Sequence, residues 1–343
     1  MPFKASAPAS LMLLGEYGVL YGKQALVCAI DKRIHVTLSP RIDDKIEIFS
    51  HPYSRSVYST DIQHLTVQRP FQFVLGVLKQ YQSKLTQGCT IKIESEFSDQ
   101  VGFGSSAAVT VATLAALFAW LDIKVSKQRH VPIGRLIVQG IQGVGSGADI
   151  AASIYGGLIR YRASPLIVEK YPLLYPLTVL YSGFKTPTAV AVTQVQKCFT
   201  HRPDVLHQLC DNIAECVSEG IQLINEHACL SKLGNILLRQ QELLVKLGVS
   251  LPLLQNMVDS LNAQPGIFGA KISGAGLGDC VIGLGYPPDN YVYCERDANV
   301  KKNRKIEVCS PAAILFPDAS KIKGCVQRFP VSMTASGVQC ETI

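Results

Sequence analysis

The chain has 343 residues, of which 48% are hydrophobic and 17% charged, so it can bury enough apolar surface to offset chain entropy and is not of the disordered class. Single cores usually stop growing near about 250 to 300 residues, so the length predicts two domains. The net charge of +7 is scattered. The one dense basic run, Lys301, Lys302, Arg304 and Lys305, is interpreted as a solvated loop. We expect no nucleic-acid partner, and a mildly basic chain suits a small anionic substrate.

Cysteine usage favours a reduced, cytoplasmic protein, because the eleven cysteines stand singly without a CxxC pair. Five residues could be drawn as a metal cluster, but they fall on helical patterns and we interpret them as core packing. They are His207, Cys210, Cys216, His227 and Cys229. The longest apolar run, Ala107 to Leu121, is shorter than the roughly 20 residues of a membrane span, and no secretory signal precedes the first strand. We expect no membrane association and either a monomer or a homodimer.

The first half of the chain mixes strands with glycine loops. Alternating hydrophobicity predicts strands over Ala25 to Leu38, Lys45 to Phe49 and Thr90 to Ser95. A long apolar helix follows from Ser105 to about Trp120. A short helix after residue 150, the turn Gly156-Gly157 and a strand over Leu158 to Arg162 complete this half.

The second half is helical before it returns to strands. Apolar residues recur at helical spacing over residues 203–227, 231–247 and 251–262. A strand, a loop over Ser273 to Asp279, a second strand and a β-rich tail follow. We place the domain boundary at residue 185, which gives α+β domains over 1–185 and 186–343.

A glycine turn over Val101 to Ala108 runs directly into the long helix. Gly102 and Gly104 let backbone N–H groups approach a ligand, and the helix N-terminus adds roughly half a positive charge. This arrangement is typical of a phosphate-binding loop. Ser105 and Ser106 could cap the helix or offer a hydroxyl to phosphate-bound Mg²⁺. The alternative is an ordinary capped helix after a turn.

Three segments, in order along the chain, resemble the motifs of the GHMP superfamily of small-molecule kinases. They are residues 7–22, which contain Gly15-Glu16-Tyr17, the glycine turn over 101–108, and residues 271–280. A fourth segment, 145–157, is similar to the one that carries the catalytic aspartate in mevalonate and phosphomevalonate kinases. The resemblance covers essentially the whole chain.

This resemblance implies the two-domain α+β GHMP kinase fold, with a ribosomal-S5-like N-terminal domain, a ferredoxin-like C-terminal domain and a cleft between them. It implies ATP and Mg²⁺ as cofactors and Asp149 as the catalytic residue. The residues implied to bind ATP are Gly102, Gly104, Ser105, Ser106 and Ala107, with Ser106 also on the metal. Those implied to bind substrate are Glu16, Tyr17, Ser146, Ser273, Gly274, Ala275 and Gly276.

Several of these residues also have structural interpretations. Small residues surround Asp149, so a substrate could approach its carboxylate, which can accept an alcohol proton. The same carboxylate could instead cap the helix that follows. Glu16 could hydrogen-bond nearby backbone at a strand end, and Tyr17 could pack in the core.

Two features of the family pattern are missing. Ser10 stands where mevalonate kinases usually have a lysine beside the catalytic carboxylate, and Lys4, Lys185 or Lys271 could replace that cation. Val138, with Gln139 next to it, stands eleven positions before Asp149, where the family has an acidic metal ligand. Metal binding would then rest on Ser106, Glu16 and ATP itself.

The acceptor is left between alternatives. Residues 19–27 resemble mevalonate kinases, whereas 149–153 and Asp279-Cys280 resemble bacterial phosphomevalonate kinases. An extra phosphate would require an additional cation in the cleft, and the sequence does not place Lys185 or Arg160 there. Of these acceptors, we expect mevalonate, because residues 19–27 are the longer match. Phosphomevalonate or a sugar as acceptor, and a non-catalytic metabolite-binding regulator, are the alternatives.

Overall fold

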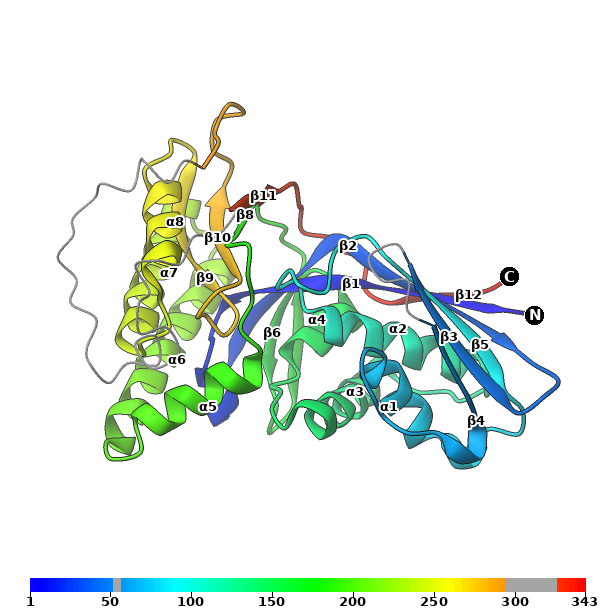
Figure 1. Cartoon of the computed structure of the whole chain (residues 1–343). Helices are drawn as coiled ribbons and strands as arrows, with labels where there is room; N and C mark the ends of the chain where they lie inside the picture. Colours follow the sequence, from blue (N-terminus) through cyan, green and yellow to red (C-terminus); the bar gives the residue numbers. More distant parts are fainter. Residues whose placement is uncertain (52–56, 294–325) are drawn as a thin grey trace.

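Two β-sheets with helices packed against them make up the part of the chain that the structure, a computed structural model, describes: residues 1–51, 57–293 and 326–343 (Figure 1). The predicted basic loop over Lys301 to Lys305 lies outside the described residues. The α+β class predicted from the sequence is confirmed.

The first sheet has the strand order β12-β1-β2-β5-β3-β4, and β6 and β7 extend it from β2. Its strands are β1 (Phe3–Leu14), β2 (Ala25–Pro40), β3 (Lys45–His51), β4 (Val57–Asp61), β5 (Cys89–Ser95), β6 (Leu158–Arg162), β7 (Ile167–Tyr171) and β12 (Gln339–Thr342). All pairs are antiparallel except β3 with β5. The register of β1 on β2 shifts between Pro8 and Ala9, because proline has no N–H to donate to the ladder.

Four helices cover one face of this sheet (Figure 1). They are α1 (Gln72–Gln80), α2 (Ser105–Trp120), α3 (Lys127–Gln142) and α4 (Ala148–Tyr155). Helices α2 and α4 pack directly on β1 and β2, and α1 and α3 pack on α2. Helix α2 is rich in buried alanine, which lets its backbone lie close to the strands. The sheet therefore brings the start of α2, the start of α4 and the middle of β1 together.

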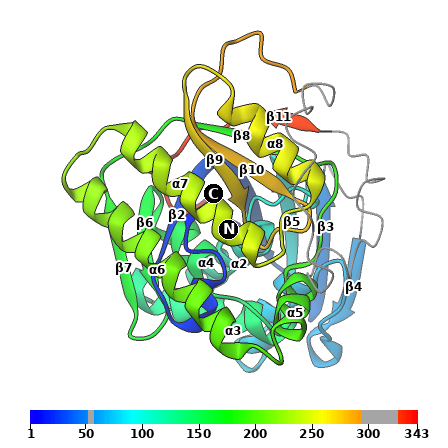
Figure 2. The ribbon, with the colours of Figure 1, turned by 90° about the vertical axis from the view of Figure 1, so that its left-hand side faces the viewer.

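The second sheet has the order β11-β8-β10-β9, all antiparallel. Its strands are β8 (Leu177–Tyr181), β9 (Ile267–Ser273), β10 (Cys280–Gly285) and β11 (Gln327–Phe329). The remaining helices are α5 (Thr188–Cys198), α6 (Pro203–Asn225), α7 (Leu230–Lys246) and α8 (Pro252–Asn262), with short 3₁₀ turns at Gly18–Tyr21 (η1), Ile62–His64 (η2) and Gln82–Lys84 (η3). Helices α7 and α8 lie side by side over β9, as Figure 2 shows, and α6 packs on α7 and reaches η1.

The three predicted helices of the second half are confirmed as α6, α7 and α8, and the predicted strands on either side of residues 273–279 are β9 and β10. The boundary at residue 185 stays a prediction. Strand β8 pairs in the second sheet although it precedes residue 185, and β12 pairs in the first sheet at the end of the chain.

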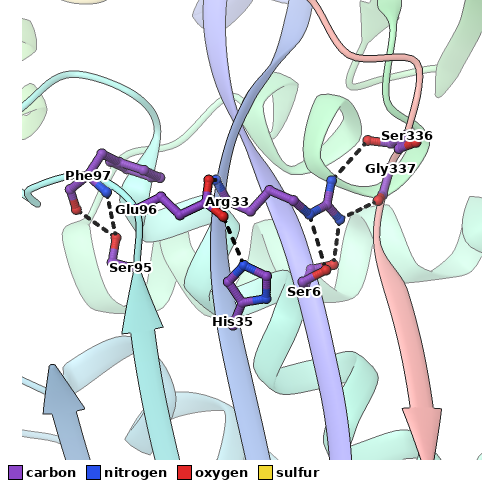
Figure 3. Close-up of polar contacts among 8 residues, drawn as sticks. All are labelled: Ser6, Arg33, His35, Ser95, Glu96, Phe97, Ser336 and Gly337. Carbon is purple, nitrogen blue, oxygen red and sulfur yellow. Dashed lines mark hydrogen bonds and ion pairs between the residues drawn. The ribbon is translucent and has the colours of Figure 1, made fainter. Parts of the chain in front are cut away.

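Arg33 on β2 holds the C-terminal segment against the first sheet by hydrogen bonds to Ser336 and Gly337 (Figure 3). The Arg33 guanidinium donates to the Ser6 carbonyl at 3.0 Å, to the Gly337 carbonyl at 2.8 Å and to the Ser336 carbonyl at 3.4 Å. A Cβ on Gly337 would lie 2.2 Å from the Ile154 carbonyl of α4, so the tail packs tightly against that helix. One side chain thus ties β1, β2 and the tail together.

Of the five cysteine and histidine residues predicted to pack in the core, only two are buried. Cys210 and Cys216 are buried on α6, as predicted, but His207, His227 and Cys229 are exposed and that part of the interpretation is wrong, because the outer faces of α6 and the loop after it carry them. Within the described ranges, no three His, Cys, Asp or Glu side chains are grouped to hold a metal. None of the described helices is long and apolar enough to cross a membrane.

Candidate active site

A cleft of about 1150 Å³ lies where the two sheets meet. Most of the predicted site residues line it, although they come from four separate stretches of the chain. They are Glu16, Tyr17, Gly102, Gly104, Ser105, Ser106, Ala107, Ser146, Asp149, Ser273, Gly274 and Ala275. Gly276 is not among the lining residues: it is buried, and a Cβ there would lie 2.7 Å from the Val249 carbonyl.

The glycine turn before α2 leaves the start of that helix open to a ligand. Gly104 is the N-cap with φ of 63°, and no side chain caps the helix. The capping interpretation of Ser105 and Ser106 is therefore wrong, because the backbone of Gly104 already forms the N-cap. A Cβ on Gly104 would lie 2.3 Å from Ser10 Oγ, so both backbone conformation and space require glycine.

Asp279, from the loop between β9 and β10, lies directly against this turn. A Cβ on Gly102 would lie 1.9 Å from Asp279 Oδ1. The Asp279 carboxylate is buried, and its Oδ1 has no hydrogen-bond partner among the described atoms. Burial raises the pKa of Asp279 to about 6, opposed by the charge of Lys185 and by a hydrogen bond from the Gly102 N–H.

Asp149 lies in the first turn of α4, but Gly147 is the N-cap and no side chain caps this helix. The capping alternative for Asp149 is therefore wrong. Its Oδ1 instead accepts a hydrogen bond from the Ser10 hydroxyl of β1 at 2.8 Å. Burial raises the pKa of Asp149, and the Ser10 hydrogen bond and the charge of Lys185 lower it.

Glu16 and its neighbours connect β1 to the second sheet. The buried Glu16 carboxylate accepts from the Lys271 ammonium of β9 and from the Gln240 amide of α7, and Gln240 Oε1 accepts from the Gly15 N–H at 3.1 Å. Burial raises the pKa of Glu16 and lowers that of Lys271, and the charge of each partner opposes the shift of the other. Sequence reasoning missed Gln240, whose only signal was a polar residue on the inner face of a helix.

Two further contacts hold the loop after β9 over the cleft. The Tyr17 hydroxyl donates to the Ala275 carbonyl at 2.7 Å, and the Ser273 hydroxyl donates to the Met12 carbonyl at 3.0 Å. Tyr17 is both buried and at the cleft wall, so it combines the two interpretations given to it.

The three lysines that could replace the family's cation at the position of Ser10 lie in different surroundings. Lys4 is on β1 beside Glu341 of the edge strand β12 and does not line the cleft. Lys271 is buried on Glu16. Lys185 lines the cleft, whereas Arg160 is engaged with Gln24 and Glu169 outside it.

The structure offers no acidic metal ligand at Val138, the position where the family has one. Val138 on α3 lines the cleft but its side chain has no oxygen, and Gln139 is not among the lining residues. A side-chain oxygen for a metal ion must therefore come from other cleft residues.

Comparison with known proteins agrees with this arrangement. The family of GHMP kinases N terminal domains matches residues 72–157, and the GHMP kinases C terminal family matches residues 213–291. Mevalonate kinase from Pyrococcus abyssi is 30% identical over 301 residues, which cover 82% of this chain and 88% of that protein.

Solved structures show the same fold with different acceptors. The Methanococcus jannaschii mevalonate kinase structure has a TM-score of 0.72 at 21% identity, covering 96% of this chain and 98% of that one. The structure of Lactococcus lactis galactokinase complexed with galactose has a TM-score of 0.76 at 16% identity, and the match covers 98% of this chain and 95% of that one. The fold alone therefore does not choose the acceptor.

A glycine turn that opens a helix and a buried aspartate face one cleft between the two sheets, an arrangement suited to phosphoryl transfer. The chain belongs to the GHMP kinase family, and within that family it is similar to mevalonate kinases over most of its length. It is a kinase, so the alternative of a non-catalytic regulator is set aside.

Proposed function

We propose that this kinase transfers the γ-phosphate of ATP to the hydroxyl of mevalonate, with Asp149 accepting the hydroxyl proton. The observation that carries the proposal is the buried Asp149 carboxylate, hydrogen-bonded to Ser10 and open to the same cleft as the glycine turn. The mevalonate kinases among its relatives support the choice of acceptor.

The reaction needs positioning and one proton acceptor. Asp149 Oδ1 is engaged by Ser10, so we assign Oδ2 to the acceptor hydroxyl. A raised pKa makes the carboxylate a stronger base for that proton. The hydroxyl oxygen then bonds to the γ-phosphorus while the bond to the β–γ bridging oxygen breaks, which leaves ADP.

ATP phosphates are proposed to lie at the N-terminus of α2, against the backbone of Gly104, Ser105, Ser106 and Ala107. The Gly102 N–H points to Asp279 and not to the proposed phosphate site. Gly102 is needed because any side chain there would collide with the Asp279 carboxylate. The uncapped helix start fits a triphosphate.

Mg²⁺, when bound, would neutralise the phosphate charge, and we propose the Ser106 hydroxyl as its protein oxygen. Few protein ligands suffice, since Mg²⁺ usually keeps several waters and takes most other oxygens from the nucleotide.

The acceptor is proposed to contact Tyr17, Ser146, Ser273, Gly274 and Ala275, all at the cleft wall. Glu16 lines the cleft but its carboxylate is taken up by Lys271 and Gln240, and Gly276 is buried behind the lining residues. We assign both to holding the wall in place. The acid end of mevalonate requires a cation, and Arg135 of α3 lines the cleft beside Gly147, where a Cβ would lie 2.9 Å from Arg135 Cδ.

The test is ADP release measured with mevalonate, phosphomevalonate and a panel of sugars that includes galactose. We expect kcat/KM with mevalonate to exceed that with every other compound by at least about tenfold, since polar groups that a substrate leaves unpaired cost binding. A faster reaction with phosphomevalonate or a sugar would replace mevalonate as the acceptor. A cytoplasmic location and a monomeric or homodimeric state stay predictions.

A further inference from the structure

We infer that Lys185 is a catalytic residue of this kinase, placing its ammonium group on the γ-phosphate oxygens during transfer. The inference rests on the proposed function only in requiring phosphoryl transfer at Asp149. It does not depend on which acceptor is used.

The backbone around Lys185 is fixed to the loop between β9 and β10. The Ser182 N–H donates to the Asp279 carbonyl at 3.0 Å, and the Asp279 N–H donates to the Phe184 carbonyl at 2.8 Å. The Thr186 hydroxyl donates to the Leu277 carbonyl at 2.5 Å. Contacts on both sides of Lys185 thus hold its Cα at the cleft edge.

The Lys185 side chain is half-buried, lines the cleft and is not neutralised. Its ammonium donates a hydrogen bond to the Asp99 carbonyl that is long, at 3.5 Å. Among the described residues, no carboxylate oxygen lies within 4.0 Å of its Nζ. Its charge nevertheless acts on both buried carboxylates of the cleft, Asp149 and Asp279. An unpaired ammonium at such a place is suited to an anion that arrives with the ligand.

Arg69, Lys79 and Arg135 also line the cleft. Lys271 is paired with Glu16, Lys79 donates to the Leu65 carbonyl at 3.0 Å, and Arg135 lies over the turn at Gly145 to Gly147. None of these cations lowers the pKa of Asp149 as Lys185 does.

The Lys185 ammonium is suited to stabilise the charge that develops during phosphoryl transfer. The equatorial oxygens of the transferring phosphoryl group carry negative charge, and a fixed cation stabilises them in the transition state. Asp149 and Asp279 would otherwise face that charge with carboxylates. Lys185 offsets this repulsion while the proton passes from the acceptor hydroxyl to Asp149.

The experiment compares Lys185→Gln, Lys185→Arg and the matched control Lys4→Gln, using whichever acceptor the wild-type enzyme accepts. We expect Lys185→Gln to lower kcat by about 10² or more while ATP affinity, measured by calorimetry, changes much less. Lys185→Arg should keep part of the activity, and Lys4→Gln should match the wild type. Melting temperatures of all variants control for folding.

A pH profile separates catalysis from a structural role. Because Lys185 lowers the pKa of Asp149, the acid limb of the kcat profile should move to higher pH in Lys185→Gln. Retention of more than about half of wild-type kcat, or an unmoved acid limb, would overturn the inference. An inactive wild type with mevalonate but an active one with another acceptor would instead count against the proposed function alone.

Discussion

At the scale of single residues, Asp149 tests whether the cleft works as proposed. Asp149→Asn is nearly isosteric and can still accept the Ser10 hydrogen bond, but it cannot take a proton. We expect turnover to fall by about 10² or more, with ATP affinity close to that of the wild type. Steady-state kinetics and nucleotide titration measure the two effects. A variant with more than half the wild-type turnover would show that Asp149 is not the proton acceptor.

Asp279 makes a different prediction, about stability rather than turnover. Its pKa is raised by burial to about 6, so the folded state binds a proton more tightly than the unfolded chain does. The stability that this proton contributes is complete below the unfolded pKa and is lost as pH rises through about 6. Asp279→Asn removes the charge and should gain about 1 to 3 kcal/mol over the wild type above that pH, and little at pH 4. Denaturant unfolding at pH 4, 6 and 8 measures the difference; a gap that does not change with pH would contradict it.

Secondary structure was predictable from the sequence where one face of an element is polar and the other apolar. Helices α6, α7 and α8 carry such faces and end within two residues of the predicted limits. Helix α3 was missed because Pro132 and its glycines interrupt the helical pattern. The pairing of β12 with β1 could not be predicted, because four exposed residues leave no periodic signal.

The C-terminal segment gives a prediction at the same scale. Arg33→Met keeps the aliphatic stem but loses the donors to Ser6, Ser336 and Gly337 (Figure 3). We expect a loss of about 1 to 3 kcal/mol, together with faster hydrogen exchange in residues 332–343. Arg162→Met is the matched control, because the Arg162 guanidinium donates to the Pro165 carbonyl within its own turn. Unchanged exchange in the tail would show that Arg33 does not hold it.

The whole molecule brings together residues that no local pattern connects. The glycine turn and Asp149 were identifiable because each lies in a short motif. The contacts that hold the site together were not identifiable, because Ser10 and Asp149 are 139 positions apart in the sequence and Lys271 and Glu16 are 255 apart. Glu16 looked like a substrate contact from its motif, whereas the fold surrounds its carboxylate with Lys271 and Gln240. Lys185 and Lys271 are likewise far from Ser10 in the sequence. The sequence alone therefore could not show which of Lys4, Lys185 and Lys271 lies in the cleft.

The Glu16–Lys271 pair decides whether this connection between the sheets is structural or catalytic. Both side chains are buried, so Lys271→Met leaves a buried charge unpaired and should cost about 3 to 5 kcal/mol, as should Glu16→Met. Replacing both by methionine removes the two charges together, and we expect the double variant to recover most of the loss. The exposed pair Lys92–Glu94 is the control, with a coupling below about 1 kcal/mol. Denaturant unfolding gives the coupling energy, and additive losses at the buried pair would contradict it. Turnover is measured in the same variants: recovery in the double variant means that Glu16 holds the cleft wall, and continued loss in a folded double variant means that its carboxylate contacts the substrate.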